Sequence, residues 1–262
     1  LLLLAATACG GATGVELPQP TPDEPPEESY RAVPGFDTRD YPGEGIMAAW
    51  RESSPYQWVG YYLPAPCYTG TTWQGKRESL QRQGWGIAVL FVGEQDWPTP
   101  AARDSLADDP RCVSDNLTPD NGAAHAREAQ REAAREGFPR GTVIYLDVER
   151  VESVSDALAG YVSAWTAALL EQGRYVPGLY AHARNASELV DLMADEYASQ
   201  GRTDRPRLWV ASPSGFSLRR GPAESGFEAH IWQGALDVEE RWGGHTLRID
   251  ANVAASQEPS GQ

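Results

Sequence analysis

Two acidic side chains with a single residue between them end an apolar segment. The segment 142–149 reads Thr-Val-Ile-Tyr-Leu-Asp-Val-Glu, so that its acids are Asp147 and Glu149. Because side chains alternate across a strand, both acids share one face, with their Cα atoms roughly 6.6 Å apart. That separation is within reach of one substrate bond. The spacing therefore predicts two carboxyl groups that can act together on one ligand.

Two more acids lie near the ends of other predicted strands. Asp37 ends the segment 33–37, and Asp250 lies near the end of the segment 246–251. Four carboxyl groups at one site repel one another, so at least one should keep its proton to a higher pH than a free side chain. Such an acid can protonate a leaving oxygen while an ionised neighbour stabilises positive charge or activates water, as in glycoside hydrolysis. Arg248 shares a strand face with Asp250 and inside a barrel would need pairing.

The segments that must position these acids alternate between strand and helix patterns. Short β-branched and aromatic stretches predict eight strands, near residues 33–37, 57–63, 86–92, 142–149, 175–180, 207–211, 229–233 and 246–251. Stretches of helical period predict five helices, at residues 45–53, 73–83, 121–137, 154–172 and 185–200. Such alternation indicates parallel strands with helical crossovers, and about 220 residues is the usual size of a (β/α)₈ barrel. We expect an α/β fold, a single TIM-like barrel over residues 33–254 with irregular sixth and seventh connections.

Composition and motifs exclude several classes of function. The chain of 262 residues has 37 Asp and Glu against 22 Lys and Arg, a net charge of −15 at pH 7, and so lacks a basic surface for nucleic acid. Its four histidines have no H-x-x-x-H or H-E-x-x-H spacing, and phosphate-loop and nucleophile-elbow motifs are absent. We accordingly expect no metal, no cofactor and no nucleic-acid partner.

The two ends of the chain differ in composition from the barrel. Residues 1–9 resemble the remnant of a secretory signal that lacks its true N-terminus and ends in a lipobox-like cysteine, Cys9. A lipid on Cys9 would anchor a secreted protein to the bacterial envelope, and ordinary A-x-A cleavage just before it is the alternative. The Pro- and Glu-rich residues 10–32 predict a disordered spacer, and residues 255–262 a disordered tail. We expect a monomer that contacts the membrane through that lipid only.

Two cysteines remain once Cys9 is set aside. Cys67 and Cys112 make an even pair, which in an oxidising compartment favours a disulfide between them. Two unpaired thiols are the alternative.

Aromatic and amide side chains near the strand ends suit a sugar ligand. The chain has 9 Trp and 11 Tyr residues, whose rings can stack on sugar faces. From their strand-end positions we expect these substrate-binding residues: Tyr62, Gln95, Tyr180, Trp209, Trp232 and Gln233. Trp50, Trp85 and Trp165 are expected in the core. The set favours an oligosaccharide groove over a site for a small, highly charged ligand.

A series of short motifs resembles a known family. In chain order the motifs are Gly35-Phe36-Asp37-Thr38, Met47-Ala48-Ala49-Trp50, Val59-Gly60-Tyr61-Tyr62, Gly84-Trp85-Gly86, Phe91-Val92-Gly93-Glu94-Gln95, Gly141 to Glu149, and Trp232-Gln233. They resemble the glycoside-hydrolase-like domain catalogued as domain of unknown function 1906, a secreted bacterial TIM-barrel family, over residues 33–253. More distantly, the chain is similar to the family 25 lysozymes, which cut the glycan strands of peptidoglycan.

The resemblance to those lysozymes implies a role for each acid. Glu149 would be the general acid. Asp147 would stabilise the oxocarbenium-like centre, or orient an N-acetyl group serving as internal nucleophile, while Asp37 and Asp250 would tune and position the pair. The segments 94–119 and 212–228 have no counterpart in the lysozymes, so the choice of substrate does not carry over.

Three functions remain open. The leading hypothesis is an envelope-anchored, lysozyme-like glycoside hydrolase that acts on cell-wall peptidoglycan or a related polysaccharide. The second is a catalytically inactive envelope lipoprotein that binds glycan. The third is a structural envelope protein without a ligand, whose carboxylates should be salt-bridged to arginines instead of facing an open pocket.

Overall fold

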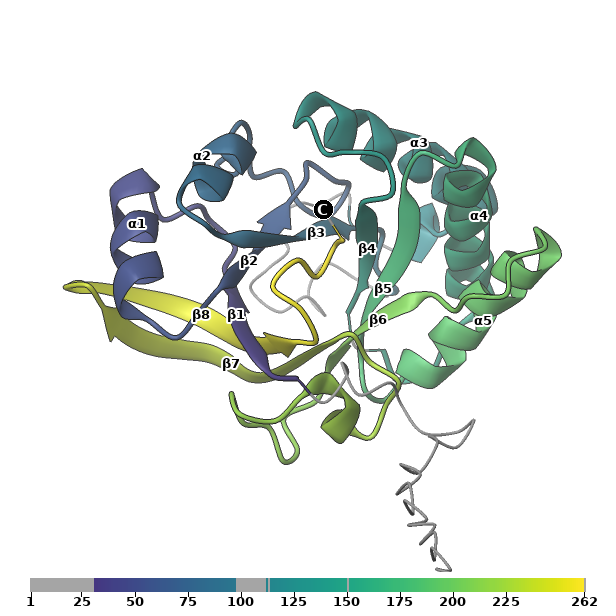
Figure 1. Ribbon diagram of the computed structural model, residues 1–262. Helices are drawn as coiled ribbons and strands as arrows, with labels where there is room; N and C mark the ends of the chain where they lie inside the picture. The colour runs from purple at the N-terminus through teal and green to yellow at the C-terminus, as the bar shows by residue number, and fades with distance from the viewer. Residues whose placement is uncertain (1–30, 98–111, 113, 150, 262) are drawn as a thin grey trace, which may run out of the picture.

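Eight strands close into a single barrel in the order β1 to β8 (Figure 1). The computed structural model describes residues 31–97, 112, 114–149 and 151–261, so that Cys9, the signal remnant and nearly all of the predicted spacer lie outside the described residues. The strands are β1 (Val33–Asp37), β2 (Trp58–Tyr62), β3 (Gly86–Val92), β4 (Val143–Val148), β5 (Val176–His182), β6 (Arg207–Ala211), β7 (Ile231–Trp242) and β8 (His245–Ala254). The predicted TIM-like barrel is confirmed.

Five α-helices cover the outside of the first six strands. They are α1 (Glu44–Ser53), α2 (Arg77–Arg82), α3 (Pro119–Arg135), α4 (Asp156–Gln172) and α5 (Ala186–Ser199), with short 3-10 helices η3 (Ser114–Asn116) and η4 (Pro222–Ser225). Trp50, Trp85 and Trp165 are buried against them, as predicted. The sixth and seventh connections contain no α-helix, also as predicted. None of the helices in the described part of the chain has the length and apolar character needed to cross a bilayer.

The last strand runs in the opposite direction to the other seven. β8 pairs antiparallel with both β7 and β1, whereas the sequence pattern predicted parallel strands throughout. Gly243 and Gly244 alone connect β7 to β8, and both have positive φ, 55° and 84°. A two-residue turn of this kind makes an antiparallel hairpin, because a parallel crossover needs a dozen or more residues. The hairpin rests on α1, where the Trp50 indole donates to the His245 carbonyl at 3.1 Å.

Aromatic side chains fill the inside of the barrel beneath its C-terminal end. Along β4, Tyr145 belongs to the cluster inside the barrel, and Ile144 and Leu146 belong to the cluster under the helices, which confirms the predicted alternation. The Trp209 ring lies edge-on to Trp58 and Tyr145, with centroids 5.6 and 5.7 Å apart. The barrel is therefore packed up to the level of the acids.

The C-terminal residues close the opposite end of the barrel, and the prediction of a disordered tail is wrong. Ser260 is fully buried; its hydroxyl accepts from the Val89 amide and its carbonyl from the Val143 amide, both at 2.9 Å. Figure 1 shows this yellow segment crossing the barrel. Gly86 makes room for it, because a Cβ there would lie 1.6 Å from the Gln257 carbonyl oxygen. The polar composition concealed this role, since Ser260 is held by hydrogen bonds from the main chains of β3 and β4.

Candidate active site

Asp37, Asp147, Glu149 and Asp250 all border one cavity of about 360 Å³ at the C-terminal end of the barrel. Asp37 is the last residue of β1, Asp147 is the last but one of β4, and Glu149 follows β4 directly. Asp250 reaches the same level for a different reason than predicted: it lies in the middle of β8, which descends from above the mouth, and it pairs in register with Asp37 at the end of β1. The acids therefore border an open cavity, which is not what the hypothesis of a structural envelope protein without a ligand predicts.

Asp37 is held in one orientation by three neighbouring strands. Its Oδ2 accepts from the Tyr62 hydroxyl at 2.7 Å, and its Oδ1 accepts from the side-chain amides of Gln233 at 3.0 Å and Asn252 at 2.8 Å. Burial raises the pKa of Asp37, and these three hydrogen bonds oppose the rise by favouring the ionised form. The Trp209 indole in turn donates to Asn252 Oδ1 at 2.9 Å, which fixes the amide.

Asp147 is as deeply buried as Asp37 but lacks comparable partners. Among the described residues nothing hydrogen-bonds its Oδ1, and the side chain is 5% exposed. Burial raises the pKa of Asp147 well above its ordinary value, and the negative charges of Glu149 and Asp37 raise it further. Asp147 therefore keeps its proton at a pH where an exposed aspartate has lost it.

Asp250 is bound by a bulge in the neighbouring strand. The register of β7 against β8 shifts between Gln233 and Val238, and Asp237 in this stretch has a φ of 55°. The bulge aims the Asp237 amide at Asp250 Oδ1, at 2.6 Å, while the Asp237 carboxylate pairs with Arg248 at 3.0 Å. The side chains of Arg248 and Asp237 are 66% and 73% exposed, so this is a surface ion pair and not the pairing inside the barrel that the sequence led us to expect. Burial first, and then the charge of Asp37, raise the pKa of Asp250 to about 7.

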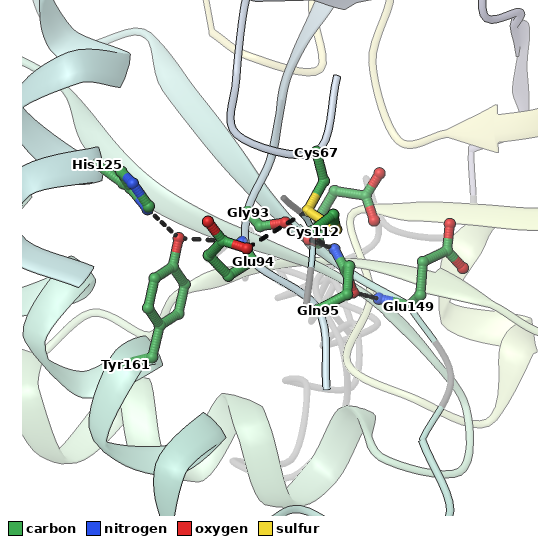
Figure 2. The surroundings of a disulfide bond; sticks show 9 residues. Cys67, Gly93, Glu94, Gln95, Cys112, His125, Glu149 and Tyr161 are labelled. Carbon is green, nitrogen blue, oxygen red and sulfur yellow. Dashed lines mark hydrogen bonds between the residues drawn. A yellow bond between two sulfur atoms is a disulfide. The ribbon is translucent and has the colours of Figure 1, made fainter. Parts of the chain in front are cut away.

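The half-buried Glu149 is positioned through its main chain by Gln95, which lies beyond the end of β3 (Figure 2). Gln95 Oε1 accepts from the Glu149 amide at 2.8 Å, and its Nε2 donates to the carbonyls of Asp147 at 2.9 Å and Gly93 at 3.0 Å. Figure 2 shows the Glu149 carboxylate pointing away from Gln95. Gln95 therefore fixes the backbone on both sides of Val148.

Cys67 and Cys112 form a disulfide beside Gln95, and the alternative of two free thiols is wrong. The bond joins the connection after β2 to the connection after β3 across 45 residues. Glu94 Oε2 lies 3.8 Å from Cys67 Sγ, and these three residues are the only metal-like cluster among the described residues. Because a metal takes thiolates and not disulfide sulfurs, the cluster in this state is a covalent link and not a metal centre.

The six predicted sugar-binding residues divide into two groups. Tyr62 and Tyr180 border the cavity as expected. The other four, Gln95, Trp209, Trp232 and Gln233, are at most 1% exposed and are absent from its lining, so the prediction that they contact substrate is wrong.

Each of the four has a protein partner that explains its burial. Trp209 fills the barrel below the mouth. Trp232 points outward from β7, where its ring meets Phe216 edge-on at 5.3 Å and its indole donates to the Ser212 carbonyl at 2.7 Å. Gln95 binds main-chain groups, and Gln233 accepts from the Tyr180 hydroxyl at 2.8 Å besides donating to Asp37.

The sequence reasoning missed several residues around the mouth: Arg39, Asp40, Tyr68, Trp97 and Asp237. Arg39 and Asp40 lie two and three residues after Asp37, so their place just after a strand could have predicted them. Tyr68 and Trp97 lie in the connections after β2 and β3, and their distance from the strand ends hid them. A larger cavity of about 500 Å³ lies between α5 and the segment before β7, but it includes none of the four acids.

Comparisons with known proteins identify the family and agree with the barrel fold. The profile of the Rv2525c-like, glycoside hydrolase-like domain matches residues 48–254. Among curated proteins, no match to the chain is found.

Solved structures share the fold at low identity. An uncharacterised *B. stearothermophilus* protein is 21% identical, with a TM-score of 0.55 over 85% of this chain and 95% of its own. The *Mycobacterium tuberculosis* Tat-secreted protein Rv2525c is 17% identical, with a TM-score of 0.52 over the same shares. GHIP, a glycosyl hydrolase 25 of *Streptococcus pneumoniae*, is 15% identical, with a TM-score of 0.52 over 84% and 86%. Because the matched profile spans more than half of the sequence, this chain belongs to the Rv2525c-like, glycoside hydrolase-like domain family.

Proposed function

We propose that the protein is a glycoside hydrolase that cleaves a bacterial cell-wall polysaccharide or a related glycan at the mouth of the barrel. One observation carries the proposal: carboxyl groups from β1, β8 and the end of β4 border one open cavity at the end of the barrel where catalytic groups are found. The likeness in fold to cell-wall lytic enzymes such as the autolysin LytC of *Streptococcus pneumoniae* supports it.

In this proposal Glu149 and Asp147 carry the chemistry. Glu149, at the solvent side of the cavity, protonates the leaving oxygen of the glycosidic bond. Asp147, at the buried side, stabilises the oxocarbenium-like centre, or orients an N-acetyl group acting as internal nucleophile, once it has given up its proton. Asp37 acts on this pair by its charge, which raises the pKa of Asp147 and also that of Asp250. Asp250 borders the same cavity.

The roles can be separated by the leaving group. Glu149→Gln should stop the release of reducing ends from a natural glycan, yet cleave an aryl glycoside whose leaving group needs no protonation. Asp147→Asn should fail on both substrates. The reverse pattern would make Asp147 the acid, in keeping with its raised pKa. Sugar binding without cleavage by the wild-type protein would instead establish the catalytically inactive binding protein.

We further propose that the protein works outside the cytoplasmic membrane, with the lipid on Cys9 as its anchor. The disulfide supports an oxidising compartment, and the related Rv2525c is a Tat-secreted protein. Mass spectrometry of the mature N-terminus tests the anchor, because A-x-A cleavage would leave an unmodified Cys9.

A further inference from the structure

The mouth cavity is rich in hydrogen-bond acceptors and poor in uncommitted hydroxyl donors. Four lining residues carry hydroxyl groups, and each hydroxyl already donates to the protein. The acceptors are the Arg248 carbonyl for Thr38, Asp37 for Tyr62, the Arg39 carbonyl for Tyr68 and Gln233 for Tyr180. The hydroxyl groups of the lining therefore have no proton left to donate to a ligand.

The charges around the cavity point the same way. Its lining has six acidic residues and two basic ones, Arg39 and Arg248, and Arg248 is already paired with Asp237. Asp147 lies in the lining of the cavity, and its own Oδ1 is buried and has no hydrogen-bond partner among the described residues. An ammonium group beside Asp147 would favour the ionised carboxylate and bind it through a charge-assisted hydrogen bond, and such hydrogen bonds are the stronger ones.

We infer that the cavity selects an amino sugar whose amine is free and protonated, over the same sugar in its N-acetylated form. This inference rests on the proposed function and names its substrate class. An ammonium group has three N–H donors and no acceptor atom, so it needs no hydrogen-bond donor from the protein. An acetamide group has one N–H donor and a carbonyl oxygen, which needs a hydrogen-bond donor from the site. The committed hydroxyls leave that carbonyl without a hydroxyl partner in the described lining.

A bare metal ion fits the mouth less well. The described residues place no three carboxyl oxygens of the mouth within 4.8 Å of one another, which is the spacing found only at the Cys67–Cys112 disulfide and Glu94. An ammonium needs one close acceptor and a negative field around it, and the mouth supplies both.

The test is binding of a matched pair of trisaccharides, one of β-1,4-linked glucosamine and one of N-acetylglucosamine, by titration calorimetry at pH 7 and low ionic strength. The free-amine form should bind at least about tenfold more tightly. Asp147→Asn should bring the ratio of the two affinities towards one. Asp40→Asn, at the exposed rim, should lower the ratio by a smaller factor and guards against a folding defect at position 147.

The control removes one charge elsewhere. Asp195→Asn, on the exposed side of α5, should leave the affinity ratio unchanged, which separates the cavity from general attraction to an acidic protein. Equal or tighter binding of the N-acetylated form, or a ratio that Asp147→Asn does not change, overturns the inference. If the N-acetylated trimer is bound or cleaved and the free amine is not, only the inference fails. If neither sugar binds and no glycan is cleaved, the proposed function fails with it.

Discussion

Asp37 and Asp147 show how the pKa values of two equally buried carboxyl groups can be raised to different degrees. Both are about equally hidden from solvent, at 4% and 5% exposure. Asp37 receives three hydrogen bonds, which favour the anion, while Asp147 receives none on Oδ1 and lies near two other negative charges. The fold buries both carboxyl groups, and the hydrogen bonds from Tyr62, Gln233 and Asn252 to Asp37 account for the difference between their pKa shifts.

The pKa of Asp250 predicts a dependence of stability on pH. Folding raises this pKa from 3.8 to about 7, so between these values the folded state binds more protons than the unfolded state. The contribution of Asp250 to the free energy of unfolding should therefore be greatest below pH 4, fall by at most about 4 kcal/mol as the pH rises towards 7, and level off above it. Denaturant titrations from pH 4 to 8 should show a smaller fall for Asp250→Asn. The same slope in both proteins, or an equal change in Asp195→Asn, would contradict this.

Gln95 should matter for activity although it does not line the mouth cavity. Gln95→Met keeps the length of the side chain but leaves the Glu149 amide and the Asp147 carbonyl without their partner. The free energy of unfolding should fall by about 2–3 kcal/mol, and kcat should fall with little change in KM, because Glu149 loses its position and the sugar contacts remain. The exposed Gln81→Met is the control and should change stability by less than about 0.5 kcal/mol. A rise in KM alone would assign Gln95 a contact with substrate.

At the scale of elements, the site depends on connections more than on strands. The loop after β3 holds the loop after β4 through Gln95, and it is tied to the loop after β2 by the disulfide and to α4 by the Glu94 amide, which donates to the Tyr161 hydroxyl at 3.2 Å. On the opposite wall, the bulge in β7 holds Asp250. The acids are thus held on one side by the loop after β3 and on the other by the bulge in β7, which interrupts the regular pairing of that strand.

The disulfide should contribute strongly to stability. Closing a loop of 45 residues in the unfolded chain corresponds to about 4 kcal/mol by loop-closure entropy. A variant with Cys67→Ser and Cys112→Ser should unfold at correspondingly lower denaturant concentration and lose activity before it unfolds globally. Reductant should destabilise the wild-type protein and have no effect on the double variant; an equal effect on both would contradict the prediction.

Sequence reasoning succeeded where a residue's place followed from strand period. The β4 pattern put Asp147 and Glu149 at the rim, and the eight strands gave the barrel. It failed where partners are remote in the chain: Trp209 looked like a rim residue because the filling of the barrel by Trp58 and Tyr145 is invisible to local pattern. Asp250 was predicted at the site because it lies near the end of a strand assumed to be parallel to the others. Only the two-residue Gly243-Gly244 turn indicates that β8 runs antiparallel to its neighbours. Ser260 was assigned to a disordered tail because its partners lie about 117 and more residues earlier.

At the scale of the whole molecule, the net charge of −15 governs encounter with polymers. The protein repels anionic wall polymers at an ionic strength of 0.01 M, where the Debye length is about 30 Å. The repulsion is much weaker at 0.15 M, where the Debye length is about 8 Å. The initial rate of cleavage of an anionic wall preparation should therefore rise over this range of salt. The rate on a cationic glycan should fall, and the rate on a neutral oligosaccharide serves as the control. A fall on the anionic preparation would show attraction through a local patch instead.

β1 rises towards the mouth from Val33, and the buried tail ends beneath the barrel near Gly261, so the described chain both enters and leaves at the face opposite the cavity. A short linker or a tag joined next to Val33 or Gly261 would hold the molecule by its closed base. Immobilised on a bead in this way, the protein would present its opening outward, towards material arriving from solution.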